Sequence, residues 1–174
     1  AKHKAKHHKY TKAAFFRYCY YDPAFKFFCE QVLDVDYLSL PEATRAASEV
    51  GVQNSSDYVC TPFKHILGDF AEALDLGADI LIQFGGPCRL GYYGELQESI
   101  LRDMGYDFIM MNFARGIELG YIGWAKEVLK TVNPNIDVPH GVVKLKAVAK
   151  MIEHLDSLRD FYLANAGFEM ERGA

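Results

Sequence analysis

Residues 80–88, with the sequence ILIQFGGPC, decide the fold of this chain. A short apolar run ends at the glycine-rich turn 85–87, and Cys88 follows directly. A short and almost wholly apolar run is typical of a strand that is buried on both faces of a parallel sheet. A helical pattern comes next and is closed by Gly105. A strand, a turn and a helix in this order predict a parallel α/β sheet.

The same alternation extends in both directions along the chain. We expect the other strands at 13–18, 35–40, 58–60 and 107–112, and helices at 23–33, 41–51, 62–77 and 88–104. This order predicts a doubly wound, Rossmann-like parallel sheet of four to five strands within residues 13–113. Two further helices are expected at 116–132 and 142–165, with a loop at 133–141 between them.

The regions outside this lobe differ from it in composition. Residues 1–12 contain five lysines, three histidines and no acidic residue, and we expect them to form a basic, flexible tail. The whole chain carries a net charge of −4, so the remaining residues carry −9. An acidic body argues against a nucleic-acid partner. We expect residues 114–174 to be a helical extension and the start of a linker to a second lobe, which would make the chain a fragment.

The composition also bears on the cellular compartment. No apolar run reaches the ~20 residues that span a bilayer, and no signal-peptide core is visible, so we expect a cytoplasmic protein without a membrane partner. In that compartment, four cysteines are more often metal ligands, redox thiols or core residues than disulfide partners.

Three of these cysteines, Cys19, Cys60 and Cys88, come where an expected strand is followed by a helix. In a parallel sheet such junctions lie along one edge, where these folds bind ligands. A helix N-terminus lowers the pKa of a thiol and favours the thiolate that binds metals. These residues are therefore candidate ligands of a metal ion or an iron–sulfur cluster. Cys29 lies on the apolar face of its helix and is expected to pack in the core.

Other interpretations of the same residues stay open. A cysteine after a strand is also a common small core residue, and Cys19 is supported only by its position. His65 is either a donor behind such a site or a surface residue. The chain has no CxxC pair, no complete GxGxxG fingerprint and no P-loop, so a zinc ribbon or a nucleotide site is not indicated.

Two motifs also carry a resemblance to a known family. The sequence CTPFK at 60–64 and the sequence GGPCRLGYYGE at 85–95, with ILRDMGY at 100–106, resemble the 2-hydroxyacyl-CoA dehydratase-like and acyl-CoA dehydratase activase-related proteins. The similarity is densest between residues 58 and 108. Members of this family are usually longer, so the chain resembles their N-terminal part.

The resemblance implies two Rossmann-like lobes with an iron–sulfur cluster between them. Cys60 and Cys88 would be cluster ligands by motif, and Cys19 matches only in its position after the first strand. The cluster would be of the 4Fe–4S or double-cubane type, and we expect it to be absent or incomplete in a fragment. A separate ATP-hydrolysing activator with its own cluster would supply a low-potential electron, and an acyl-CoA would be the substrate.

Several functions are compatible with this resemblance. The chain could be a lyase of the 2-hydroxyacyl-CoA dehydratase type, or a reductase that acts through its cluster. It could also be a non-catalytic accessory module of the same fold, or hold zinc on the same cysteines. A homodimer or a heterodimer is compatible with each of these functions.

Overall fold

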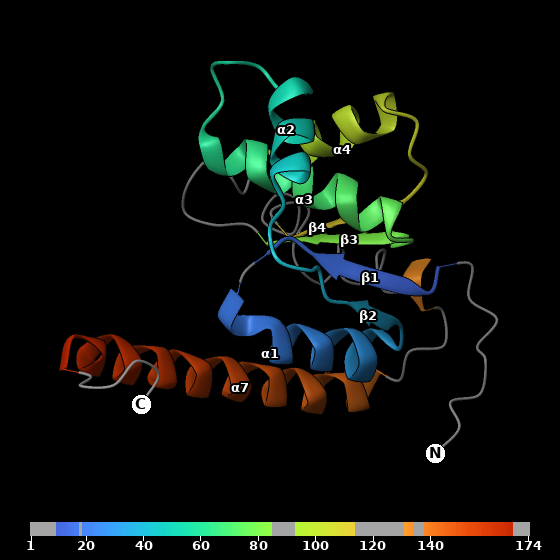
Figure 1. The fold of residues 1–174 in the computed structure, drawn as a ribbon. Helices are drawn as coiled ribbons and strands as arrows, with labels where there is room; N and C mark the ends of the chain where they lie inside the picture. The colour runs from blue at the N-terminus through green and yellow to red at the C-terminus, as the bar shows by residue number, and fades with distance from the viewer. Residues whose placement is uncertain (1–9, 18, 85–92, 114–130, 134–137, 169–174) are drawn as a thin grey trace.

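The computed structural model describes residues 10–17, 19–84, 93–113, 131–133 and 138–168 (Figure 1). In chain order the elements are β1 (Lys12–Phe15), η1 (Cys19–Tyr21), α1 (Asp22–Phe27), η2 (Phe28–Leu33), β2 (Asp36–Leu38), α2 (Arg45–Gln53), α3 (Thr61–Asp75), β3 (Ile80–Gln83), α4 (Gly94–Asp103), β4 (Ile109–Asn112), α7 (Val138–Asn165) and η4 (Ala166–Phe168). Within this described part, no helix has the length and apolar character needed to cross a lipid bilayer.

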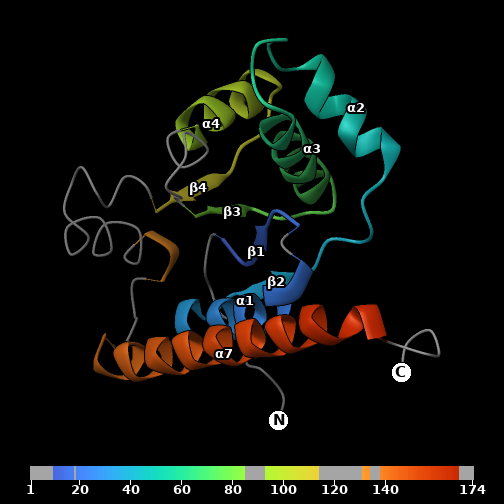
Figure 2. The same cartoon turned by 90° about the vertical axis from the view of Figure 1, so that its left-hand side faces the viewer.

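The four strands form one parallel sheet in the order β2-β1-β3-β4, which Figure 2 shows from bottom to top. Ala13 pairs with Tyr37 on one side and with Ile80 on the other, and Ile82 pairs with Met111. The doubly wound parallel α/β fold predicted from the sequence is therefore confirmed. Since β1 is flanked by β2 on one side and by β3 on the other, the strand order reverses between β1 and β3.

Helices cover both faces of the sheet (Figure 1). On one face lie α1, η2 and α7, and on the other lie α2, α3 and α4. Successive residues of β1 point to opposite faces: Ala13 and Phe15 pack on the first side, and Ala14 packs on the second, as does Phe16 just after the strand. Because both faces are covered, a strand such as β3 has no polar face, which explains why its first three residues, Ile80 to Ile82, are all apolar.

The prediction of a strand at 58–60 is wrong. Residues 57–59 form a turn and a bend, and the Tyr58 side chain is 99% exposed. Only Val59 packs against the core, because α2 and α3 lie directly against each other and leave this short connection outside the sheet. Cys60 therefore follows a turn, and it is the N-cap residue of α3.

Two helix starts also differ from the expectation. Helix α2 begins at Arg45 and not at Pro41, because the Thr44 hydroxyl accepts a hydrogen bond from the Ala47 amide at 3.1 Å and caps the helix there. Helix α7 begins at Val138, inside the loop expected at 133–141. Pro139 is compatible with this start, since a first-turn amide has no partner within the helix.

The other expected helices agree where the structure describes them. The helix expected at 23–33 consists of α1 and η2, which is a π-helix that ends at Asp34 in the left-handed region. The first residues of the helix expected at 88–104, and nearly all of the helix at 116–132, lie outside the described residues.

Helices α2 and α3 are in backbone contact at two glycines. A Cβ atom on Gly68 would lie 2.0 Å from the Ala47 carbonyl oxygen, and one on Gly51 would lie 1.8 Å from the Lys64 carbonyl oxygen. Neither backbone can move without separating the helices. These two glycines therefore fix how closely α2 approaches α3.

We predict that Gly68→Ala lowers the free energy of unfolding by at least about 2 kcal/mol, because the methyl group has no room between the helices. Urea unfolding followed by circular dichroism measures this change. The control is Gly141→Ala in α7, where no atom lies within 4 Å of the added carbon, and a gain of up to about 1 kcal/mol is expected. Equal stability of Gly68→Ala and the parent protein would contradict the contact.

Candidate functional site

The carboxyl ends of β1 and β3 lead to two of the candidate cysteines. The segment after β1 enters η1, whose first residue is Cys19. The segment after β3 leads to α4, whose Gly94 lies against the end of β4, since a Cβ atom there would be 2.5 Å from the Asn112 side-chain nitrogen. Cys88 itself lies outside the described residues, but the described chain on both sides of it reaches this edge of the sheet.

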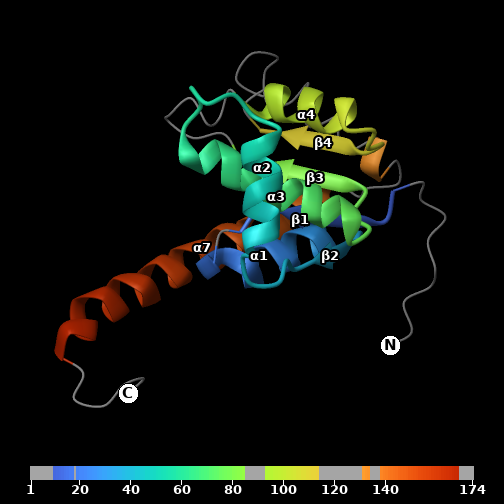
Figure 3. The same cartoon turned by 45° about the horizontal axis from the view of Figure 1, so that its top comes forward.

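Cys60 reaches the same edge from a helix. Helix α3 returns to the start of β3 through only four residues, so its first turn lies at the opposite, carboxyl ends of the strands (Figure 3). The Cys60 carbonyl accepts a hydrogen bond from the Phe63 amide at 3.1 Å, and its side chain makes no capping bond. Cys60 is exposed, so its thiol is accessible at the positive end of the helix dipole.

The described residues alone do not complete a metal site. Among them, no three side chains of His, Cys, Asp or Glu gather in a way that could hold a metal ion. Cys88, the other motif cysteine, lies outside the described ranges.

Cys29 and His65 have the simpler of the two roles that the sequence allowed: Cys29 is a core residue, and His65 is a surface residue. Cys29 is fully buried on η2, and burial, with smaller contributions from Glu30 and Asp22, raises the pKa of its thiol far above the ordinary value. It is therefore a core residue, as the sequence indicated. His65 is exposed on α3, with its Nδ1 atom 3.2 Å from the Ser48 hydroxyl.

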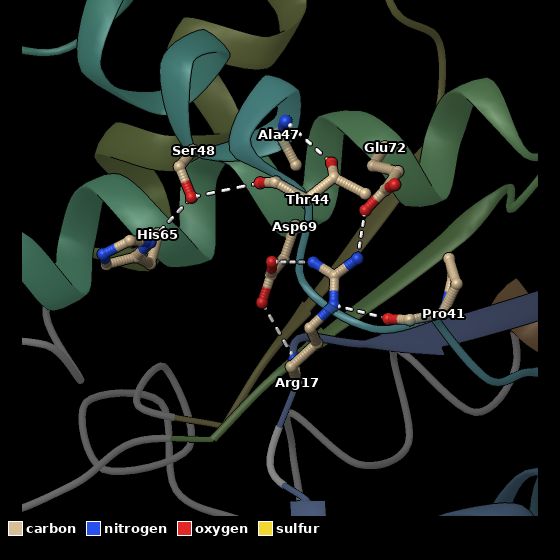
Figure 4. A network of polar contacts seen from close by, with 8 residues as sticks. All are labelled: Arg17, Pro41, Thr44, Ala47, Ser48, His65, Asp69 and Glu72. Atoms are coloured by element: carbon tan, nitrogen blue, oxygen red, sulfur yellow. Dashed lines mark hydrogen bonds and ion pairs between the residues drawn. The ribbon is translucent and has the colours of Figure 1, made fainter.

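A largely buried ionic network holds the segment between β1 and Cys19 (Figure 4). The Arg17 guanidinium forms ion pairs with Asp69 and Glu72 of α3, and its Nε atom donates a hydrogen bond to the Pro41 carbonyl at 2.7 Å. The Arg17 amide donates to the Asp69 carboxylate at 3.0 Å. The exit of β1 is thus tied to both α3 and the connection before α2.

Burial and pairing act in opposite directions on these charges. Desolvation lowers the pKa of Arg17, but the two carboxylates outweigh it, and the net pKa is raised. Burial raises the pKa of Asp69, and the contacts with Arg17 oppose that rise. Since Arg17 stays charged, its role is to neutralise the two acids between the helix and the strand.

We did not predict this network from the sequence, although two signals were present. Arg17 interrupts the apolar run at 13–18, and Asp69 lies on the apolar face of α3 between Leu67 and Phe70. A charge on a buried strand or on a buried helix face usually has a partner. The sequence does not show that Arg17 and Asp69 form a pair, because they are 52 residues apart in the chain.

Three buried amide side chains lie near the carboxyl edge: Gln83 ends β3, Asn112 ends β4, and Gln97 is in α4. The Gln97 amide nitrogen donates to the Phe63 carbonyl at 3.4 Å, in the first turn of α3. Its Oε1 atom has no hydrogen-bond partner among the described residues. Gln97 therefore joins α4 to the start of α3 and leaves an unused acceptor there.

Aromatic rings line the sheet face opposite α3 at this edge. Phe84 and Phe113 follow the ends of β3 and β4, with ring centroids 5.0 Å apart. Phe84 also stacks on Phe15 at 5.1 Å, and Phe15 stacks on Phe25 at 4.1 Å. These rings make one side of the edge apolar. Low polarity around a redox centre shifts the reduction potential of that centre.

We predict that iodoacetamide alkylates Cys60 in the folded protein and alkylates Cys29 only after unfolding. Cys60 is exposed, whereas burial shields Cys29 and raises its pKa, so that it stays a thiol at neutral pH. Peptide mass spectrometry at pH of about 8, with and without urea, measures both rates. Equal modification of the two residues without urea would disprove the assignment of Cys29 to the core.

We also predict that Arg17→Met destabilises the fold by about 3 kcal/mol, because it leaves Asp69 and Glu72 without their cation. Chemical unfolding at neutral pH measures the loss. The matched control is Arg45→Met, which removes an exposed i,i+4 pair with Glu49 and should change stability by less than about 0.5 kcal/mol. Similar effects of the two substitutions would contradict a buried network.

Comparisons of this chain with protein-family models, with curated proteins and with solved structures find no match. The description of the site therefore depends on its own geometry, and the motif resemblance at 60–64 and 85–95 stays an expectation.

Proposed function

We propose that this chain binds an iron–sulfur cluster through cysteines at the carboxyl edge of its sheet. Cys60 and Cys88 are the proposed ligands, and Cys19 is the candidate for a third. The proposed activity is low-potential electron transfer or reductive dehydration of the kind found in the family that the two motifs resemble.

The observation that carries this proposal is the strand order. In open α/β sheets, ligands bind outside the carboxyl ends of the strands where the order reverses, and here that point lies between β1 and β3. The residues after β1 lead to Cys19, and those after β3 lead to Cys88. Cys60 starts α3 at the same edge. In this fold, ligands bind at the carboxyl ends of β1 and β3, and the segments that follow both strands in the sequence contain a cysteine.

The chemistry of the donors also fits an iron–sulfur cluster. Clusters are held by cysteine thiolates, and Cys60 is an exposed cysteine at the N-cap of α3. A cluster at this exposed position would require cover from residues beyond those described.

The residues around the edge would then have positioning roles. The Arg17 network fixes the exit of β1 against α3, and Gln97 ties α4 to the first turn of α3. A bound cluster would supply single electrons at low potential. By analogy with the resembling family, the electron donor would be an ATP-hydrolysing activator and the acceptor an acyl-CoA.

Anaerobic purification of the chain, followed by iron, acid-labile sulfide and zinc analysis, tests the proposal. Because a fragment would hold the cluster incompletely, we predict iron and sulfide below one full cluster per chain in the parent protein, and loss of most of both in Cys60→Ala and Cys88→Ala. Cys29→Ala is the matched control, because it removes a buried thiol that is not a ligand, and it should keep the iron. Circular dichroism of each variant checks that it is folded.

Other outcomes separate the alternatives. Zinc without sulfide in the anaerobic sample, lost in the same two variants, would identify a zinc site. Absence of both metals from the folded parent protein would overturn the proposal.

A non-catalytic interaction module of the same fold is the second candidate function. One specific observation favours it: the C-terminal end of α7 exposes a group of large apolar side chains.

A further inference from the structure

The chain between β1 and α1 is held at both of its ends. At the first end, the Arg17 guanidinium pairs with α3 on one face of the sheet. At the second end, the Tyr21 hydroxyl donates a hydrogen bond to Asp156 and accepts one from Arg159 at 3.2 Å. Both of these partners belong to α7, which lies on the other face of the sheet (Figure 1). Cys19, the first residue of η1, lies midway between the two anchors in the sequence.

The contact between Tyr21 and α7 has a specific geometry. A phenol hydroxyl can donate one hydrogen bond and can also accept, and Tyr21 does both with α7. Asp156 and Arg159 also form an ion pair with each other at 3.3 Å, so the three side chains form a closed triangle. Because both partners of the hydroxyl are charged side chains, a shift of η1 relative to α7 would break two charge-assisted hydrogen bonds together.

Apolar packing holds α7 on the body without this polar contact. Val148 is buried in the same cluster as Phe28, and Ile152 packs against that cluster. The Asp156 and Arg159 side chains are 40% and 36% exposed, and ion pairs at such exposure contribute little to stability. We therefore expect that the contact can be removed while the chain stays folded, and that its main effect is to fix the position of η1.

We propose that Tyr21, Asp156 and Arg159 are positioning residues of the cluster site, which hold Cys19 at the carboxyl edge of the sheet. This inference rests on the proposed cluster. Since η1 is only three residues long, its own helical hydrogen bonds give it little rigidity. Removing a residue that orients a metal ligand commonly lowers metal affinity by about 10- to 100-fold. Helix α7 would thus be part of the site, although none of its residues is a candidate ligand.

Tyr21→Phe tests the proposal, because it removes the hydroxyl and keeps the ring, whose centroid lies 6.1 Å from that of Phe25. We predict that the anaerobically purified variant loses iron to an added ferrous chelator about 10-fold faster than the parent chain, and that Asp156→Ala does the same. The matched control is Tyr106→Phe. It removes a hydroxyl that donates to Asp75 at 2.8 Å at the amino end of the sheet, and it should leave the rate unchanged.

A second comparison separates positioning of Cys19 from a general loss of stability. In a Cys19→Ala background, Tyr21→Phe should no longer change the rate of iron loss, because the residue through which it acts is gone. An equal acceleration with and without Cys19 would overturn the proposal, and so would an unchanged rate in Tyr21→Phe alone. Circular dichroism checks that each variant is folded.

Amide hydrogen exchange of the metal-free chain distinguishes a failure of this inference from a failure of the proposed cluster. We expect the peptide of residues 19–25 to exchange about 10-fold faster in Tyr21→Phe than in the parent chain, because η1 loses its hydrogen bonds to α7, and to be unchanged in Tyr106→Phe. Unchanged exchange in Tyr21→Phe would overturn the positioning role and leave the cluster proposal intact. Faster exchange in a chain that binds neither iron nor sulfide would overturn the cluster, and the positioning role with it.

Discussion

The structure depends on a largely buried cation between a strand and a helix. Arg17 follows β1, and its guanidinium is neutralised by Asp69 and Glu72 from α3 while it donates to the Pro41 carbonyl. Removing such a charge from water is costly unless every partner is in place, so the three segments must meet in one arrangement. That arrangement sets where the chain leaves β1 toward Cys19 and how α3 lies over the sheet.

The close crossing of α2 and α3 adds a second constraint on the same helix. Gly51 and Gly68 bring the two backbones into contact, and any side chain at either position would separate them. With α3 fixed by Arg17 on one side and by α2 on the other, its first turn has little freedom. Cys60, the N-cap of α3, is therefore held at the carboxyl edge by contacts made one to three turns farther along the helix. A ligand site at this edge would be built on rigid elements.

The two candidate functions concern different parts of the molecule. The cluster proposal depends on thiols at the point where the strand order reverses, and the exposed apolar side chains lie at the C-terminal end of α7. Figure 1 shows the C-terminal end of α7 at the same end of the sheet as the start of α3, whereas the two helices lie on opposite faces of the sheet.

The sequence alone determined the parallel α/β class, because short apolar runs such as 80–84 alternate with helical periodicity and such strands must be buried on both faces. It also determined that Cys29 packs in the core, from its place on an apolar helix face. It was wrong about a strand at 58–60, since three residues carry too little pattern to separate a strand from a turn between two packed helices. Only the tertiary structure decided the pairing of Arg17 with Asp69 and Glu72, the backbone contact at Gly51 and Gly68, and the exposure of large apolar side chains at the C-terminal end of α7. Each of these features depends on how segments that are distant in the chain are placed in space. Local periodicity does not show which charges pair, which helices approach at a glycine, or which apolar faces are covered.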